Sequence, residues 1–146
     1  MTEPLDSDPL TLPSPQGGEG GAIEVVAAVI EREGRILIAR RPAALHMGGL
    51  WEFPGGKQKP DESARHALER EIREELGVGV TVGPLLETVD WTYPEKRVRL
   101  SFFRCAIEGE PQALEGQEIA WVPTPDLPRY EFPPADAALV ARLSRG

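Results

Sequence analysis

The sequence has little cysteine, few basic residues and no long apolar segment. Its single cysteine, Cys105, has no second cysteine with which to form an intramolecular disulfide, which suits a reducing compartment. Cys105 lies within an apolar run, so we expect a packed core residue rather than a nucleophile. No apolar stretch is long enough to span a bilayer, and the N-terminus lacks the basic start and apolar stretch of a signal peptide. These absences predict a cytoplasmic protein with no membrane partner.

Acidic residues outnumber basic ones, with 24 Asp and Glu against 16 Lys and Arg and a formal net charge of −8. An acidic chain is not expected to hold nucleic acid through a basic surface, so we expect no nucleic-acid partner. The chain can still bind a small anionic ligand if a metal cation bridges the two. Composition leaves open whether the protein is a monomer or a homodimer.

A length of 146 residues fits one domain with a single core. Residues 1–22 are rich in Pro, Gly, Ser and acids, and they contain too little apolar surface to offset the entropy lost on ordering. We therefore predict a disordered N-terminal tail over 1–22 and a folded domain over 23–146.

The folded part contains short apolar, β-branched segments and two segments with helical periodicity. Strands are predicted at Val25–Ile30, Arg35–Arg41, Leu50–Phe53, Val80–Trp91, Arg97–Ile107 and Ile119–Val122. Pro54-Gly55-Gly56 is expected to stop the third strand. A helix capped by Asp61 or Ser63 runs to about Leu76 and is closed by Gly77, and a second helix covers Pro134–Leu143. Strands around a central helix, with another helix at the end, indicate a mixed α/β domain.

The first predicted helix carries glutamates where a plain amphipathic helix would not place them. At about 100° per residue, one side of the helix gathers Ala64, Ala67, Leu68, Ile72 and Leu76, and this side should meet the core. Glu71, Glu74 and Glu75 lie within and beside that apolar side, next to one another at i, i+3 and i+4 spacing.

Two interpretations of these glutamates compete. A solvated charged face would be stabilised by ion pairs such as Glu69–Arg73 and Arg70–Glu74, each worth about 0.2–0.5 kcal/mol. Partly burying three adjacent carboxylates, in contrast, costs several kcal/mol per ion unless a cation compensates. Clustered carboxylate oxygens suit magnesium or manganese. The ion pairs account for the arginines, and a metal site accounts better for the glutamates.

The same residues belong to a longer pattern. From Gly56 to Val78 the chain matches G-x(5)-E-x(7)-R-E-U-x-E-E-x-G-U, with U aliphatic, which is the Nudix box. All nine fixed positions are filled, by Gly56, Glu62, Arg70, Glu71, Ile72, Glu74, Glu75, Gly77 and Val78. The chain resembles Nudix hydrolases from about Glu24 to Arg145, which is essentially the whole predicted domain.

Within that family the chain is most similar to the MutT group. The supporting segments outside the box are Arg40-Arg41 with His46-Met47 after it, Trp51–Gly56 and Phe132–Asp136. The resemblance implies the Nudix fold, an α/β/α arrangement in which a mixed β-sheet is sandwiched between helices. It also implies hydrolysis of nucleoside triphosphates to monophosphate and pyrophosphate in nucleotide-pool sanitation, with 8-oxo-dGTP or related damaged nucleotides as substrates and Mg²⁺, or Mn²⁺, as cofactor.

The resemblance further implies which residues carry the chemistry. Metal ligands transfer onto Glu71, Glu74 and Glu75 and onto the backbone carbonyl of Gly55. A further family glutamate, found in a loop after the long strands, is matched by Glu115 in Leu114-Glu115-Gly116-Gln117. Arg70 and Glu62 take supporting roles, with Arg70 orienting a neighbouring carboxylate. The group that accepts the proton from water is Glu71, Glu74 or Glu115, and the sequence does not choose among them.

Substrate contacts are predicted on both sides of the box. Arg41 and Lys57 are candidates for binding phosphates, although Lys57 is equally well explained as a solvated charge. Phe53, Trp91 and Phe132 are candidates for stacking on the base, with the core as the alternative for each.

Asp136 stands where the MutT group commonly has an asparagine that reads the base. Ionised Asp only accepts hydrogen bonds, which suits the exocyclic amine of cytosine or adenine, whereas a protonated Asp also donates. Its structural alternative is an acid in the first turn of a helix, favoured by the dipole. Asp136 keeps a second activity open, a CTP or 5-substituted-dCTP pyrophosphohydrolase of broad range. A non-catalytic nucleotide sensor of the same fold is a third possibility.

Overall fold

The computed structural model describes residues 22–40, 42 and 49–145, so the predicted N-terminal tail lies almost entirely outside the described residues. The elements follow the order β1 (Ile23–Arg32), β2 (Arg35–Arg40), β3 (Trp51–Glu52), β4 (Gly55–Lys57), α1 (Ala64–Leu76), β5 (Val80–Tyr93), β6 (Lys96–Ile107), β7 (Glu118–Pro123), the 3₁₀ helices η4 (Thr124–Arg129) and η5 (Pro134–Asp136), and α2 (Ala137–Arg145). None of the described helices combines the length and the apolar character that crossing a membrane requires.

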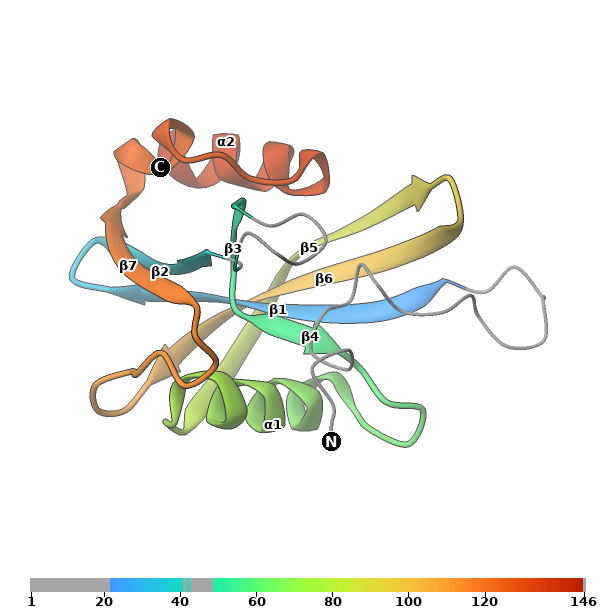
Figure 1. The fold of residues 1–146 in the computed structure, drawn as a ribbon, viewed down its shortest axis with the longest axis horizontal. Helices are drawn as coiled ribbons and strands as arrows, with labels where there is room; N and C mark the ends of the chain where they lie inside the picture. The colour runs from blue at the N-terminus through green and yellow to red at the C-terminus, as the bar shows by residue number, and fades with distance from the viewer. Residues whose placement is uncertain (1–21, 41, 43–48, 146) are drawn as a thin grey trace.

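Strand β1 lies at the centre of a seven-stranded mixed sheet (Figure 1). It pairs with β6 in parallel along Ile23–Ile30 and with β4 in antiparallel fashion along Val25–Ala27. Only its last two residues, Glu31 and Arg32, pair with β2, which in turn pairs with β3 and β7. Because β1 changes partner along its length, the sheet forks where β4 and β2 diverge.

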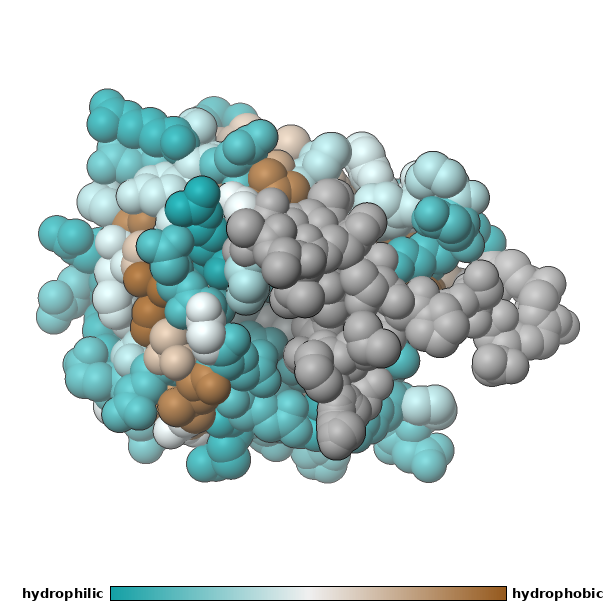
Figure 2. Space-filling model, in the orientation of Figure 1, coloured by the Kyte–Doolittle hydropathy of each residue, from teal (hydrophilic) through white to brown (hydrophobic). Residues whose placement is uncertain are grey.

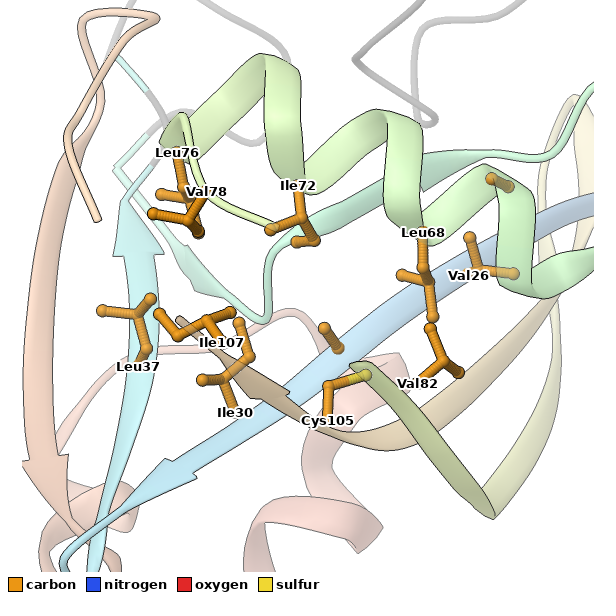
Figure 3. Close-up of a cluster of buried hydrophobic side chains, with 12 residues drawn as sticks. Val26, Ile30, Leu37, Leu68, Ile72, Leu76, Val78, Val82, Cys105 and Ile107 are labelled. Carbon is orange, nitrogen blue, oxygen red and sulfur yellow. The ribbon is translucent and has the colours of Figure 1, made fainter. Parts of the chain in front are cut away.

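Helices cover the sheet on opposite faces (Figure 1), which is the predicted α/β/α arrangement. One hydrophobic cluster lies between α1 and the sheet, where Leu68, Ile72 and Leu76 meet Ile30 of β1 (Figure 3). Cys105 packs in the same cluster, as predicted. A second cluster, which includes Leu139 and Val140 of α2, lies on the other face.

The boundaries of α1 agree with the capping residues in the sequence. The Ser63 hydroxyl accepts a hydrogen bond from the His66 N–H at 3.1 Å, which makes Ser63 rather than Asp61 the N-cap. Gly77 ends the helix in the left-handed region with φ of 73°. The predicted apolar side is buried, apart from Ala64, which is partly buried against the same cluster.

Strand β4 corrects the sequence prediction, because Gly55 and Gly56 form a paired strand instead of only ending the one before. The reason is the close approach of two backbones. A Cβ at Gly55 would lie 2.0 Å from the carbonyl oxygen of Val26, so only glycine can pair there. The Ala28 N–H also donates to the carbonyl of Pro54 at 2.7 Å, which ties the entry of β4 to β1.

The C-terminal part differs from the prediction in detail. Thr124–Arg129 forms an unpredicted 3₁₀ helix, and α2 begins at Ala137 because the residues after Pro133 first form the 3₁₀ turn η5. Seen from the side of Figure 1, the described surface is largely hydrophilic, with its hydrophobic residues in a narrow band (Figure 2).

Candidate active site

The three glutamates of α1 have different environments. Glu71 is 1% exposed and Glu75 is 8% exposed, whereas the Glu74 side chain is 53% exposed. The sequence predicted three partly buried carboxylates, and the structure buries two of them. Residues four apart share one side of a helix, so Glu71 and Glu75 both turn toward the sheet while Glu74 turns toward solvent.

Arg70 connects the buried acids to the strand beside them. Its Nε and Nη2 donate to the two carboxylate oxygens of Glu62 at 2.6 and 2.8 Å, and its Nη1 donates to Oε2 of Glu71 at 2.8 Å. Nη2 also donates to the backbone carbonyl of Lys57 in β4 at 3.1 Å. The interpretation of a solvated charged face would expose Arg70, but these contacts leave its side chain only 21% exposed. The hydrogen bond from Arg70 lowers the pKa of Glu62 to about 2.

The Glu71 carboxyl lies directly against Gly56. A Cβ at Gly56 would be 2.4 Å from the carboxyl carbon of Glu71, so the glycine leaves the space that the acid fills. Oε2 of Glu71 accepts a hydrogen bond from Arg70, whereas Oε1 is buried and accepts none from an N–H group or a hydroxyl of the described residues. Burial raises the pKa of Glu71 to about 7, although a hydrogen bond shared with the Glu75 carboxyl and the hydrogen bond from Arg70 act in the opposite direction.

Glu75 is the acid around which the others gather. Its pKa is raised first by burial and then by repulsion from Glu71, Glu52 and Glu115. The Glu115 side chain is accessible to solvent, but partial desolvation of its carboxyl and the charge of Glu74 raise its pKa. The loop carboxylate therefore lies in the same electrostatic environment as the helix carboxylates, although it is far from them in sequence.

This cluster suits a divalent cation chemically. Within the part of the chain that the structure describes, no three acidic, histidine or cysteine side chains already converge into a ready-made metal cage. The buried and unbonded Oε1 of Glu71 is nevertheless a costly group that a cation would satisfy, and the repulsion at Glu75 would be relieved by positive charge. Carboxylate oxygens are also the ligands that hard cations prefer.

A partly open pocket adjoins the acidic cluster. Gly55 and Gly56 form part of its wall, and the rest is mainly apolar and comes from β1, β5 and β6. Phe53 and Trp91 line it, and Phe53 is at the same time buried in the second hydrophobic cluster, so their contact with a base stays a prediction. Phe132 does not line this pocket; its ring stacks on Phe53 at 5.3 Å between centroids and so supports the wall from behind.

Two acids stand out in this apolar pocket. Asp136 is 5% exposed, and burial, followed by repulsion from Glu52, raises its pKa to about 8. Asp136 is therefore mostly protonated at neutral pH, so it both donates and accepts hydrogen bonds. It lies in η5, just before α2, rather than inside the first turn of that helix.

Glu52 was missed by the sequence reasoning. It lines the pocket and acts electrostatically on both Asp136 and Glu75, so it lies between the pocket and the acidic cluster. The available signal was an acid placed between two aromatic residues in a short strand directly before the glycines. Of the predicted phosphate contacts, Arg41 lies outside the described residues, and Lys57 is partly buried in β4, where its carbonyl accepts from Arg70.

Comparison with known proteins decides the family. The NUDIX domain family matches residues 25–142. The chain belongs to the Nudix family. It is thus a Nudix hydrolase of the MutT-like group, and hydrolases of this family generally need a divalent metal ion.

Three relatives of this Nudix hydrolase are similar to it over most of its length. The chain is 44% identical over 119 residues to the CTP pyrophosphohydrolase of Escherichia coli, covering 81% of this chain and 88% of the relative. It is 34% identical over 125 residues to the 8-oxo-dGTP diphosphatase of Escherichia coli, covering 84% and 97%. The crystal structure of the MutT protein from Methanosarcina mazei is 30% identical, with a TM-score of 0.76 and coverage of 87% and 96%.

Proposed function

We propose that this Nudix hydrolase is a Mg²⁺-dependent (deoxy)nucleoside triphosphate pyrophosphohydrolase that removes 8-oxo-dGTP or related damaged nucleotides from the nucleotide pool. The observation that carries the proposal is that an acidic cluster and an apolar pocket meet at Gly56, which lines the pocket and lies against the Glu71 carboxyl. A triphosphate lying over the acids would place its base in the pocket. The relatives named for 8-oxo-dGTP and CTP support this substrate class.

In this proposal the metal is held by Glu71, Glu74, Glu75 and Glu115 and by the carbonyl of Gly55. When bound, Mg²⁺ neutralises phosphate charge and lowers the pKa of a coordinated water. The contribution of Arg70 is to fix one oxygen of Glu71, which leaves Oε1 directed away from the ion pair and available as a ligand. Glu62 fixes Arg70 in turn through two hydrogen bonds.

The hydrolytic step needs a proton acceptor and an aligned phosphate chain. Water attacks the β-phosphorus, the α–β bridging P–O bond breaks, and nucleoside monophosphate and pyrophosphate leave. Of the three candidate bases, Glu74 and Glu115 are exposed, whereas Glu71 is packed against Gly56 and bonded to Arg70. We therefore assign proton acceptance to Glu74 or Glu115. We assign phosphate binding to the cationic side chains of Lys57 and Arg41.

A second candidate substrate is also compatible with a protonated Asp136. A neutral carboxyl presents one donor beside one acceptor, which is also what an asparagine side chain presents. Cytosine N3 and its amino group fit that pair, and so do O6 and N7–H of 8-oxoguanine. The neutral carboxyl therefore does not separate the two bases, and the 44% identical CTP pyrophosphohydrolase is what supports a CTP or 5-substituted-dCTP pyrophosphohydrolase of broad range as the alternative.

A substrate panel tests both candidates. The purified protein is incubated with Mg²⁺ and 8-oxo-dGTP, dGTP, CTP, 5-methyl-dCTP or 2-hydroxy-dATP, with the Glu71→Gln variant as a control, and pyrophosphate release is measured. Faster turnover of 8-oxo-dGTP than of dGTP supports the first candidate, and faster turnover of the cytidine nucleotides supports the second. Nucleotide binding without pyrophosphate release from any compound would contradict both and would indicate a sensor.

A further inference from the structure

The loop that follows β6 caps the C-terminal end of α1. The last carbonyls of a helix have no partner within the helix and need donors from elsewhere. Here the backbone N–H of Gln112 donates to the Leu76 carbonyl at 2.9 Å, and the N–H of Leu114 donates to the Glu75 carbonyl at 3.1 Å. The Leu114 side chain also covers Gly77, since a Cβ there would lie 3.1 Å from its Cδ1.

The side-chain amide of Gln117 completes this attachment. Its Nε2 donates to the Glu75 carbonyl at 3.0 Å, and its Oε1 accepts from the backbone N–H of Glu115 at 2.8 Å. One planar amide thus joins the loop at Glu115 to the helix at Glu75. Gly116, between the two loop residues, has φ of +75°, which permits the chain to fold back on itself.

We propose that Gln117 is a positioning residue, which holds Glu115 against the last turn of α1 so that the loop carboxylate and the helix carboxylates act on the same ion. The inference rests on the proposed function, in which Glu115 is a metal ligand. The charge of Glu74, which is felt at Glu115, agrees with this placement. Without the amide, an acid on an exposed loop would be repelled by Glu74 and Glu75 and would move away from them.

The geometry requires a glutamine specifically. Replacement by Glu keeps the acceptor for the Glu115 N–H but loses the donor and sets a carboxylate against the Glu75 carbonyl oxygen. Replacement by Ala removes both hydrogen bonds. Gln112 provides a matched control, because it lies in the same loop and contacts the helix through its backbone, which survives in Gln112→Ala.

The experiment compares wild type, Gln117→Ala, Glu115→Gln, the double variant and Gln112→Ala. Mg²⁺ affinity is measured by calorimetric titration, and protection of the Glu115 amide is measured by hydrogen exchange. Gln117→Ala should weaken Mg²⁺ binding about tenfold, as expected for groups that orient metal ligands. It should also lose exchange protection at Glu115, whereas Gln112→Ala should resemble wild type. In the double variant, Mg²⁺ affinity should match that of Glu115→Gln alone, because Gln117 acts through Glu115.

The proposal is overturned if Gln117→Ala binds Mg²⁺ as wild type does, if the two effects add in the double variant, or if the Glu115 amide stays protected. It is also overturned if Glu115→Gln leaves Mg²⁺ affinity unchanged. Failure of the proposed function is distinguishable, because wild type would then release no pyrophosphate from any nucleotide. The titration and the exchange measurement would still decide the role of Gln117, since neither depends on turnover.

Discussion

At the scale of single residues, one guanidinium connects the carboxylates of Glu62 and Glu71 and a strand carbonyl. Lys at position 70 would keep the charge but would lose the planar fork that bonds Glu62 through two nitrogens. We expect Arg70→Lys to lower the free energy of unfolding by about 2–3 kcal/mol, because Glu71 is left buried with a weaker partner. Chemical denaturation at pH 7 measures this. Arg73→Lys, at an exposed position of the same helix, should differ from wild type by less than about 0.5 kcal/mol, and equal losses in both variants would contradict the prediction.

The raised pKa of Asp136 predicts how the stability of the fold depends on pH. Its folded-state pKa of about 8 lies above the ordinary value of 3.8, so the fold prefers the protonated form and loses stability as pH rises between these values. Asn has the same shape and does not titrate. Asp136→Asn should therefore gain stability relative to wild type from pH 5 to pH 8, with no further gain above that. Thermal unfolding at several pH values measures the difference.

The same variant should also flatten the alkaline limb of the kcat/KM profile, if a neutral residue at 136 is what contacts the base. Asp126→Asn, at a half-exposed position in η4, serves as the control. A stability difference between Asp136→Asn and wild type that does not change with pH would show that Asp136 is ionised in the fold.

The sequence predicted which residues form the acidic cluster, because that depends on local spacing. It did not predict how exposed or how protonated each of them is. The box placed Glu71, Glu74 and Glu75 on one helix, but only the packed sheet determines that Glu74 is the exposed one. Of the two i, i+4 ion pairs considered, Arg70–Glu74 forms at 3.8 Å. Arg70 makes shorter contacts with Glu62, at 2.6 Å, and with Glu71, at 2.8 Å. The protonation of Asp136 likewise depends on burial next to Glu52, which no short segment of sequence contains.

At the scale of elements, the glycines of strand β4 determine how closely β4 and helix α1 approach each other. A methyl group at position 56 would displace the Glu71 carboxyl, which lies 2.4–2.7 Å from where that Cβ would stand. We expect Gly56→Ala to lower the free energy of unfolding by about 1–3 kcal/mol, the usual cost of overpacking. Its kcat should fall further than this instability explains, because Glu71 is moved out of position.

The control for this prediction is Gly79→Ala. A Cβ at Gly79 would meet only the Arg73 guanidinium at 3.6 Å, an ordinary contact. Steady-state kinetics with the best substrate of the panel, at a temperature where all variants are folded, separates the two effects. Wild-type kcat in Gly56→Ala would show that the contact with Glu71 has no role in turnover.

Helices and strands with a clear periodicity of apolar residues were predicted from the sequence. Elements that form only through pairing with a distant strand were not. Helix α1 and the long strands follow from apolar periodicity and capping residues. Strand β4 does not, because Pro-Gly-Gly is typical of a turn, and its pairing depends on how near β1 runs. The 3₁₀ helix η4 was missed because the prolines within Thr124–Arg129 argue against regular structure in that segment.

At the scale of the whole molecule, metal binding and folding stability should be linked through the buried acids. In the absence of metal, the raised pKa values of Glu71 and Glu75 mean that the fold favours their protonated forms, so stability falls as pH rises toward 7. Metal binding requires the ionised forms. A fixed Mg²⁺ concentration of about 100 times the Kd at pH 8 should therefore add about 2.7 kcal/mol at pH 8 and clearly less at pH 6, where the Kd is higher.

Thermal unfolding with Mg²⁺, with EDTA and with NaCl at matched ionic strength checks this linkage. EDTA should return the Tm to its metal-free value, and NaCl should reproduce little of the shift. An equal Tm shift at both pH values would mean that the acids of α1 do not exchange protons for metal.

The parallel pairing of β1 with β6 has a consequence for how the site comes into being. Glu24 and Arg99, which face each other in this ladder, are 75 residues apart in sequence, so a long stretch of chain must close before the centre of the sheet exists. Helix α1 leaves the ribosome well before β6 does. We expect the growing chain to carry its glutamates as ordinary solvated acids until β6 has been synthesised, and the ability to bind metal to appear only after β6 has paired with β1.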